Sequence, residues 1–165
     1  MSLRSLLDDL GRVFRRLLSR KGVPQATFSI DHILAQGRLT EARERFRLGQ
    51  ADPDKTAKYS HRPTWQLVCE EVLDTDFDPP VYDAIYAELL RRGYDDRTID
   101  DLRRLAWETA GWMNYDLMLW EWTVLEESDM KIALDLQRER GLIGAIEHER
   151  RLERIREVSE RPIPD

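Results

Sequence analysis

The sequence predicts an all-α fold, an irregular bundle of about six or seven helices around a central tryptophan-rich helix over about residues 98–127. Residues 107–125 carry four of the five tryptophans and are apolar on nearly all sides at 100° per residue, which is typical of a buried helix. The charged fraction of 35% suits helices with ionic outer faces. No segment alternates between apolar and polar residues for long enough to predict a strand.

The central helix is expected to bury two stripes of side chains. Thr98 is its predicted N-cap, with Asp101 three residues later as a variant of the capping box. Such a helix can fill the core alone, bury one side in a second subunit or partner, or line a ligand-stacking pocket. The first stripe comprises Leu102, Ala106, Ala110, Met113, Leu117, Trp120 and Val124, and the second comprises Trp112, Tyr115, Leu119 and Trp122.

The composition limits the classes of function. The chain has 165 residues, which favours one domain, and its net charge of −6 argues against nucleic-acid binding by the chain as a whole. It contains no run of 18 apolar residues, so no membrane span is expected. A single cysteine excludes an intrachain disulfide and fits a cytoplasmic location. Along the chain we distinguish an N-terminal helix (1–22), a helical core (23–127) and a charged C-terminal extension (128–165).

Residues 2–20 are expected to form a basic amphipathic helix that ends at Gly22. Three roles fit this helix: packing on the body of the domain, lying on an anionic membrane surface, or docking into a groove on a partner. Asp8 and Asp9 weaken the membrane role, because they sit among the charges that would face lipid headgroups. The partner-binding candidates are Leu3, Leu6, Leu7, Leu10, Phe14 and Leu17, together with Arg12, Arg15 and Arg16.

Residues 28–49 are predicted to form a helical hairpin that breaks at Gly37. The segment "QGRLTEARERF" resembles the turn and second helix of a tetratricopeptide repeat, with Gly37, Ala42 and Phe46 at the spacing of that motif. The preceding helix lacks the aromatic residue and the Leu-Gly pair of the motif, and no second copy follows at that period. The resemblance therefore implies a helical hairpin of that shape, not a repeat protein.

Shorter helices and polar loops make up the rest of the chain. The longest loop is expected over residues 50–62, before a short helix over 64–73. A further helix starts at Pro79 and ends at Gly93. The last helix, over about 145–160, is mostly charged, so it is expected to protrude or to meet a partner along one narrow apolar seam.

Neither a metal site nor a catalytic residue is predicted. The Glu-x-x-His pairs of di-iron bundles are missing. Asp74, Asp76 and Asp78 alternate like the start of an EF-hand loop, but Pro79 stands where that loop needs glycine. Cys69 lies in an apolar stripe before two glutamates, which raise the pKa of a thiol and favour a buried structural role. Phosphate-binding loops and dinucleotide fingerprints are also missing, so no cofactor is expected.

Acidic residues beside the tryptophans are the remaining chemical candidates. They interrupt the central helix and point in different directions, so each would need its own arginine or backbone donor if it were buried. The candidates for an interface or a pocket are Trp112, Tyr115, Trp120 and Trp122, with Glu108, Asp116 and Glu121.

These features lead us to expect a non-enzymatic interaction module, an adaptor, assembly or accessory protein that binds another protein or a second copy of itself through helix faces. The first alternative is a helical enzyme, or a protein that binds a small molecule or a metal, which uses the acids near the tryptophans; a deep pocket converging on them would favour it. The second alternative is a peripheral membrane protein anchored by residues 2–20. Specific nucleic-acid binding is not expected.

Overall fold

The computed structural model describes residues 29–52, 58–73, 77–116 and 124–164. These residues form helices and connecting segments, and no strand occurs among them, which confirms the all-α prediction. The helices are α2 (Ile30–Gln36), α3 (Arg38–Arg47), α4 (Thr64–Cys69), α5 (Pro79–Arg91), α6 (Asp96–Ala106), α7 (Glu127–Glu139) and α8 (Ala145–Glu160), with a 3₁₀ turn η2 (Glu70–Val72) and a π-helix η3 (Trp107–Asp116).

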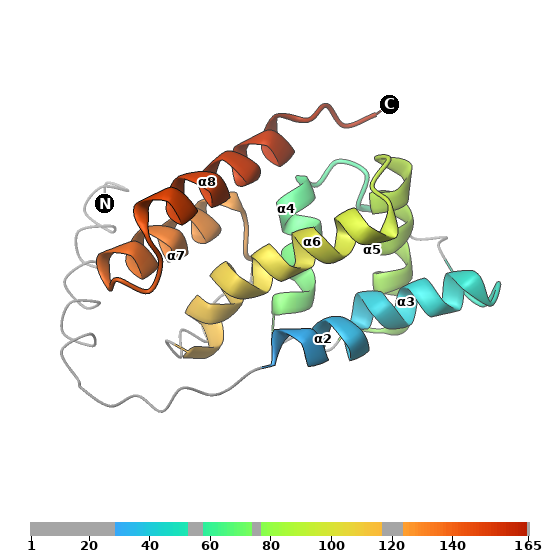
Figure 1. Cartoon of the computed structure of the whole chain (residues 1–165). Coiled ribbons are helices and arrows are strands. Elements are labelled where there is room, and N and C mark those ends of the chain that lie inside the picture. Colours follow the sequence, from blue (N-terminus) through green and yellow to red (C-terminus); the bar gives the residue numbers. More distant parts are fainter. Residues whose placement is uncertain (1–28, 53–57, 74–76, 117–123, 165) are drawn as a thin grey trace, which may run out of the picture.

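Helix α6 runs through the middle of the described structure (Figure 1). Helices α7 and α8 form an antiparallel pair, while α4 and α5 lie nearer the other end of α6. One hydrophobic cluster connects these elements, because it contains Leu102 of α6, Ile85 of α5, Leu134 of α7 and Ile155 of α8. The indole of Trp65 lies in the same cluster, and its Nε1 donates a hydrogen bond to the Ile155 carbonyl at 2.9 Å.

The predicted central helix over 98–127 is wrong in its geometry and in both of its ends. Asp95, not Thr98, is the N-cap of α6, and its carboxylate accepts a hydrogen bond from the Thr98 amide at 2.7 Å. The α-helix ends at Ala106 and continues as the π-helix η3, whose i→i+5 hydrogen bonds turn the chain less per residue than an α-helix does. Glu126 is extended and precedes a separate helix.

The change in geometry explains which predicted stripe positions are buried. Ala110 and Met113 are fully buried, as predicted, whereas Trp112 and Tyr115 are only partly buried. Val124 is 44% exposed, because it precedes α7 and does not continue the helix. The predicted stripe positions Leu117, Leu119, Trp120 and Trp122 lie outside the described residues.

Helices α2 and α3 do not form the predicted hairpin. Only Gly37 separates them, and Figure 1 shows the two helices following one another along one side of the molecule. A helical hairpin needs a connection of about two to five residues to reverse the chain. Ala42 is buried and Phe46 packs against the core, so α3 still uses its motif-like positions for packing.

A buried ion pair between Arg103 and Glu71 joins four segments of the chain, α2 (through the Leu34 carbonyl), α3, η2 and α6. The Arg103 guanidinium donates from Nε and Nη2 to the two carboxylate oxygens of Glu71, at 2.7 and 2.9 Å. Its Nη1 donates to the Thr40 hydroxyl at 2.9 Å, and Glu71 also accepts from the Leu39 amide at 2.9 Å. The two charged side chains are 1% and 2% exposed. Arg103 also donates to Asp100 at 2.9 Å, whereas the buried Glu71 carboxylate depends on Arg103 for compensation of its charge.

Gly37 makes room for this ion pair. A Cβ atom at this position would lie 2.4 Å from Glu71 Oε1, 2.7 Å from Arg103 Nη2 and 2.7 Å from the Ile33 carbonyl oxygen. Its φ of −75° is open to any residue, so the need for glycine comes from the close approach and not from the backbone conformation.

A second buried arginine, Arg92, binds the segment of the chain that precedes α4. Arg92 pairs with Glu88 at 2.7 Å, and both side chains are 2% exposed or less. Arg92 also donates to the Thr64 hydroxyl at 2.9 Å and to backbone carbonyls of residues 59–62, the closest being Arg62 O at 2.8 Å. This contact orders the described end of the predicted long loop, because one side chain satisfies several carbonyls of the loop at once.

The charged helix α8 packs on the core through a narrow apolar seam. Ile155 and Val158 are buried, and Leu152 packs against the core. His148 is also buried, with Nε2 2.8 Å from the Asp135 carboxylate of α7. The narrow seam predicted for this helix therefore contacts the rest of the chain.

We predict that Gly37→Ala lowers the free energy of unfolding by about 1–3 kcal/mol, because the new methyl group overlaps a closely packed ion pair. Gly144→Ala is the matched control. Both glycines are N-caps with nearly the same backbone angles, −75° and 168° against −79° and 167°, but nothing lies within 4 Å of a Cβ atom built at Gly144. Urea denaturation measures both losses, and equal losses would contradict the steric explanation.

We also predict that Arg103→Ala costs about 3–5 kcal/mol of stability, because it leaves the buried Glu71 carboxylate without a compensating charge. Arg47→Ala is the control, since Arg47 is 60% exposed although it pairs with Glu44 and Asp96. Its expected cost is about 0–1 kcal/mol. Chemical denaturation at neutral pH checks both values, and similar losses for the two variants would refute a central role for Arg103.

Candidate functional site

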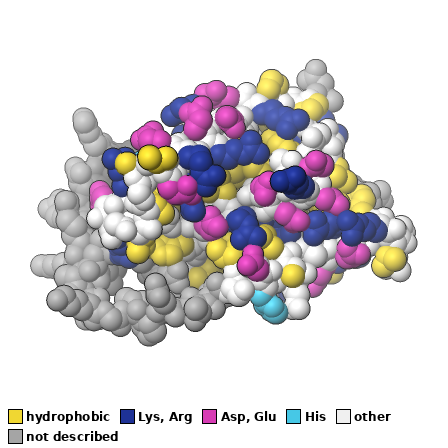
Figure 2. All heavy atoms as spheres, in the orientation of Figure 1, with side chains coloured by type: hydrophobic (Ala, Val, Ile, Leu, Met, Phe, Trp, Pro, Cys, Tyr) yellow, Lys and Arg dark blue, Asp and Glu magenta, His cyan; other side chains and the backbone are white. Residues whose placement is uncertain are grey.

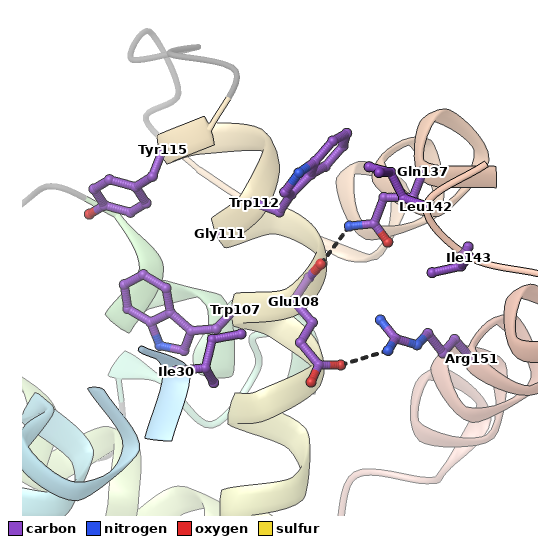
Figure 3. A pocket seen from close by; sticks show the side chains of 10 residues that line it. All are labelled: Ile30, Trp107, Glu108, Gly111, Trp112, Tyr115, Gln137, Leu142, Ile143 and Arg151. Carbon is purple, nitrogen blue, oxygen red and sulfur yellow. Dashed lines mark hydrogen bonds and ion pairs between the residues drawn. The ribbon is translucent and has the colours of Figure 1, made fainter. Parts of the chain in front are cut away.

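A pocket of about 260 Å³ lies where η3 meets the connection between α7 and α8 (Figure 3). We call it the aromatic pocket. Three aromatic side chains of η3 line it, and isoleucine and leucine side chains from distant segments complete its apolar wall. Its lining residues are Ile30, Trp107, Glu108, Gly111, Trp112, Tyr115, Gln137, Leu142, Ile143 and Arg151.

The wide backbone of η3 shapes one wall of the pocket. The Thr109 hydroxyl donates to the Leu105 carbonyl at 2.6 Å, at the point where the α-helix gives way to the π-helix. Gln137 of α7 donates from Nε2 to the Glu108 carbonyl at 2.6 Å. These side-chain donors supply partners to carbonyls at a change in helical hydrogen bonding. A π-helical turn is found frequently at functional sites.

Trp107 and Tyr115 form a stacked pair on one side of η3. Their ring centroids are 5.6 Å apart with an interplanar angle of 26°. Gly111 lies between them in sequence, and a Cβ atom there would lie 2.8 Å from Cε3 of Trp107. Glycine at this position thus lets the indole lie flat against the helix. Figure 3 shows Trp112 turned to another side of η3, and its ring centroid is 5.4 Å from the Arg140 guanidinium.

An ion pair forms the polar edge of the pocket. Arg151 Nη2 lies 3.0 Å from Glu108 Oε2, and the two side chains are 18% and 27% exposed. Arg151 also donates from Nε to Glu147 at 2.5 Å. Hydrogen bonds from Arg150 and Arg151 lower the pKa of Glu147 to about 2. The Glu147 carboxylate therefore remains charged at neutral pH.

A second depression, of about 550 Å³, lies between α6 and α8. We call it the charged groove. Glu108 and Arg151 belong to both depressions, so their ion pair stands where the aromatic pocket meets the charged groove. On the face shown in Figure 2, basic and acidic side chains are interspersed, with hydrophobic surface between them. The groove is lined by Asp101, Arg104, Leu105, Glu108, Arg150, Arg151, Glu153, Arg154 and Glu157.

Two polar atoms of pocket-lining side chains are buried without a hydrogen-bond partner in the described part of the chain. They are Nε1 of Trp107, a donor, and Oε1 of Gln137, an acceptor. Buried polar atoms are normally hydrogen-bonded, so each such atom requires an explanation. Both atoms belong to side chains that line the aromatic pocket.

The structure brings three of the predicted site residues together. Glu108, Trp112 and Tyr115 all line the aromatic pocket. Asp116 ends η3, and its side chain is not described. Trp120, Glu121, Trp122 and all the candidates of the N-terminal helix, residues 3–17, lie outside the described residues.

Several pocket residues were not predicted as site residues. Trp107 and Gly111 precede the predicted Tyr115 by eight and four residues, and this spacing could have placed them on the same side of a helix. Gln137 and Arg151 come from α7 and α8, and their distance along the chain from η3 leaves no local signal of the contact.

The described residues with metal-binding or nucleophilic side chains are mostly paired or buried. They contain no group of three or more His, Cys, Asp or Glu side chains placed to hold a metal ion. Cys69 is fully buried, as predicted, and burial together with the nearby Asp129 and Glu70 raises the pKa of its thiol. Glu108, the acid in the pocket, is held by an arginine.

Comparison of the chain with protein-family models, with curated proteins and with solved structures gave no significant match. Among the helices of the described residues, none combines the length and the apolar character needed to cross a membrane.

We predict that Gly111→Ala disturbs the Trp107–Tyr115 stack, because the methyl group would overlap the indole edge. The expected loss of stability is about 1–3 kcal/mol. A double-mutant cycle with Trp107→Leu tests the cause: once the indole is gone, the Gly111→Ala loss is expected to shrink by at least about 1 kcal/mol. Unfolding measurements give the four free energies, and additive losses would contradict the steric contact.

Proposed function

We propose that this protein is a non-enzymatic interaction module that holds an apolar side chain of a partner protein in the aromatic pocket. The observation that carries the proposal is the apolar pocket itself, which is bounded by an ion pair that it shares with an adjacent charged groove. This arrangement matches the general anatomy of binding surfaces, in which an aromatic anchor site is surrounded by polar groups.

The size of the pocket supports a side chain as its occupant. Pockets for drug-sized molecules measure about 300–1,000 Å³, and the aromatic pocket, at about 260 Å³, is smaller than this range. Leu142 lines the pocket and is 55% exposed, so an apolar side chain that entered would cover it. Covering apolar surface contributes about 25 cal/mol per Å², which favours an apolar anchor.

The charged groove would receive the residues that flank this anchor. Its arginines are engaged in ion pairs: Arg104 with Asp31 at 2.7 Å and Arg154 with Glu157 at 3.2 Å. Because both signs of charge occur side by side, a partner must present matching charges in the correct order. Such a pattern contributes specificity and orientation more than affinity.

A small-molecule ligand is the second candidate, favoured by the unpartnered atoms Trp107 Nε1 and Gln137 Oε1. A planar apolar molecule with one acceptor and one donor would have the complementary groups.

The membrane-surface role, self-association and the cytoplasmic location stay predictions. The membrane-surface role depends on residues 2–20.

The test is a selection of binding peptides from a random library on the immobilised full chain. We expect the selected peptides to share an apolar anchor and to bind the Leu142→Glu variant at least about tenfold more weakly, since the new carboxylate would be desolvated against the anchor. Isothermal titration of the selected peptides with both proteins measures the change.

Leu48→Glu is the control for this experiment. Leu48 is 67% exposed at the C-cap of α3 and does not line the pocket, so binding should be unchanged. Peptides that bind equally well to the Leu142→Glu variant would refute the proposed site. Binding of indole or phenol, with no peptide selected, would favour the small-molecule candidate instead.

A further inference from the structure

We propose that the first occupant of the aromatic pocket is a segment of this same chain, residues 2–20, which would compete with any external partner. The inference rests on the proposed function, because it treats the pocket as a docking site for an apolar side chain. It adds an intramolecular occupant and thus a means of regulation.

The place where the chain enters the described structure supports this occupant. Twenty-eight residues precede Ser29, and Ile30 already lines the pocket. Residues 21–28 can span at most about 26–29 Å when extended, and a helix over residues 2–20 would be about 28 Å long. The amphipathic segment is therefore tethered beside the pocket and is long enough to lie across it.

The charges of the two parts are complementary. Residues 1–22 hold six of the 26 basic residues and two of the 32 acidic ones, which gives this segment a charge of +4. The remaining 143 residues consequently carry a charge of −10. Opposite net charges favour encounter of the segment with the body of the domain.

The apolar surfaces of the two parts also match. Leu6 and Leu10 lie one helical turn apart on the predicted apolar side of the segment. On the described surface, Leu142 at the pocket and Ile146 at the start of α8 are 55% and 88% exposed. A leucine side chain suits a pocket of about 260 Å³, and its neighbour on the same side of the helix can cover exposed apolar surface beside the pocket.

Tethering gives this occupant an advantage over free partners. A short tether raises the effective concentration of a segment at its site to the order of millimolar, so contacts weaker than those of a free partner are sufficient for occupancy. A partner would then need higher affinity, or a condition that draws residues 2–20 away, before it could bind.

Paramagnetic relaxation in the full chain tests the proposal. A nitroxide label at Ser5→Cys reports the position of the segment, because the native Cys69 is fully buried and would not be labelled. We expect the methyl signals of Leu142 and Ile143 to lose more than half of their intensity, relative to the reduced label, while the methyl signals of Leu48 are unchanged.

Two variants provide the controls. Leu6→Gln with Leu10→Gln is expected to abolish the broadening, whereas Asp8→Asn with Asp9→Asn, on the polar side, is expected to keep it. Equal broadening of Leu142 and Leu48, or no broadening, would overturn the proposal. Broadening of Leu142 in an isotope-labelled chain without nitroxide, on addition of the nitroxide-labelled chain, would also overturn it, since a second copy would then be the occupant.

The peptide measurement separates this inference from the proposed function. If residues 2–20 occupy the pocket, the Leu6→Gln, Leu10→Gln variant should bind the selected peptides at least threefold more tightly than the native chain. Peptides that bind both proteins equally, through Leu142, would leave the proposed function standing and refute the intramolecular occupant. Broadening at Leu142 without any selected peptide would support the intramolecular occupant and would refute the binding of an external partner.

Discussion

The buried ion pair between Arg103 and Glu71 joins helices α2, α3 and α6 to the 3₁₀ turn after α4, and the packing of this half of the molecule depends on it. A charged pair in such a dry position is stable only when nearly every donor and acceptor is matched. The close fit extends to Gly37, where the chain passes against both charged groups. A polar interaction thus dictates backbone geometry that the hydrophobic core alone would leave open.

The same principle operates elsewhere in the described structure. Glu88 is held by Arg91 and Arg92, and Asp83 by Arg45, in each case with a buried carboxylate. A large charged fraction therefore does not imply that all charges face water, because part of it stabilises contacts between helices. This use of arginine follows from its fork of donors, which can bind a carboxylate and backbone carbonyls together.

The aromatic pocket has a different origin. It forms where α6 widens into η3 and where the aromatic side chains of η3 meet a connection from the C-terminal pair of helices. Thr109 and Gln137 satisfy carbonyls of this wider segment, and Gly111 lets an indole lie close to the backbone. The adjacent pair Glu108–Arg151 then gives an otherwise apolar cavity a charged edge. An apolar anchor site with a polar edge is the arrangement on which the proposed binding function depends.

The sequence by itself determined the helical class, the end of α5 at Gly93, the extent of α8 and the burial of Cys69, because periodicity, glycine and proline act over a few residues. It also identified Glu108, Trp112 and Tyr115 as candidates for a pocket, since acids beside aromatic residues stand out in a helical pattern. Only the tertiary structure decided the π-helix, the partner of each buried charge and the presence of Trp107, Gln137 and Arg151 around one pocket. These features depend on contacts between residues far apart in the chain, where helical periodicity carries no information about which faces meet.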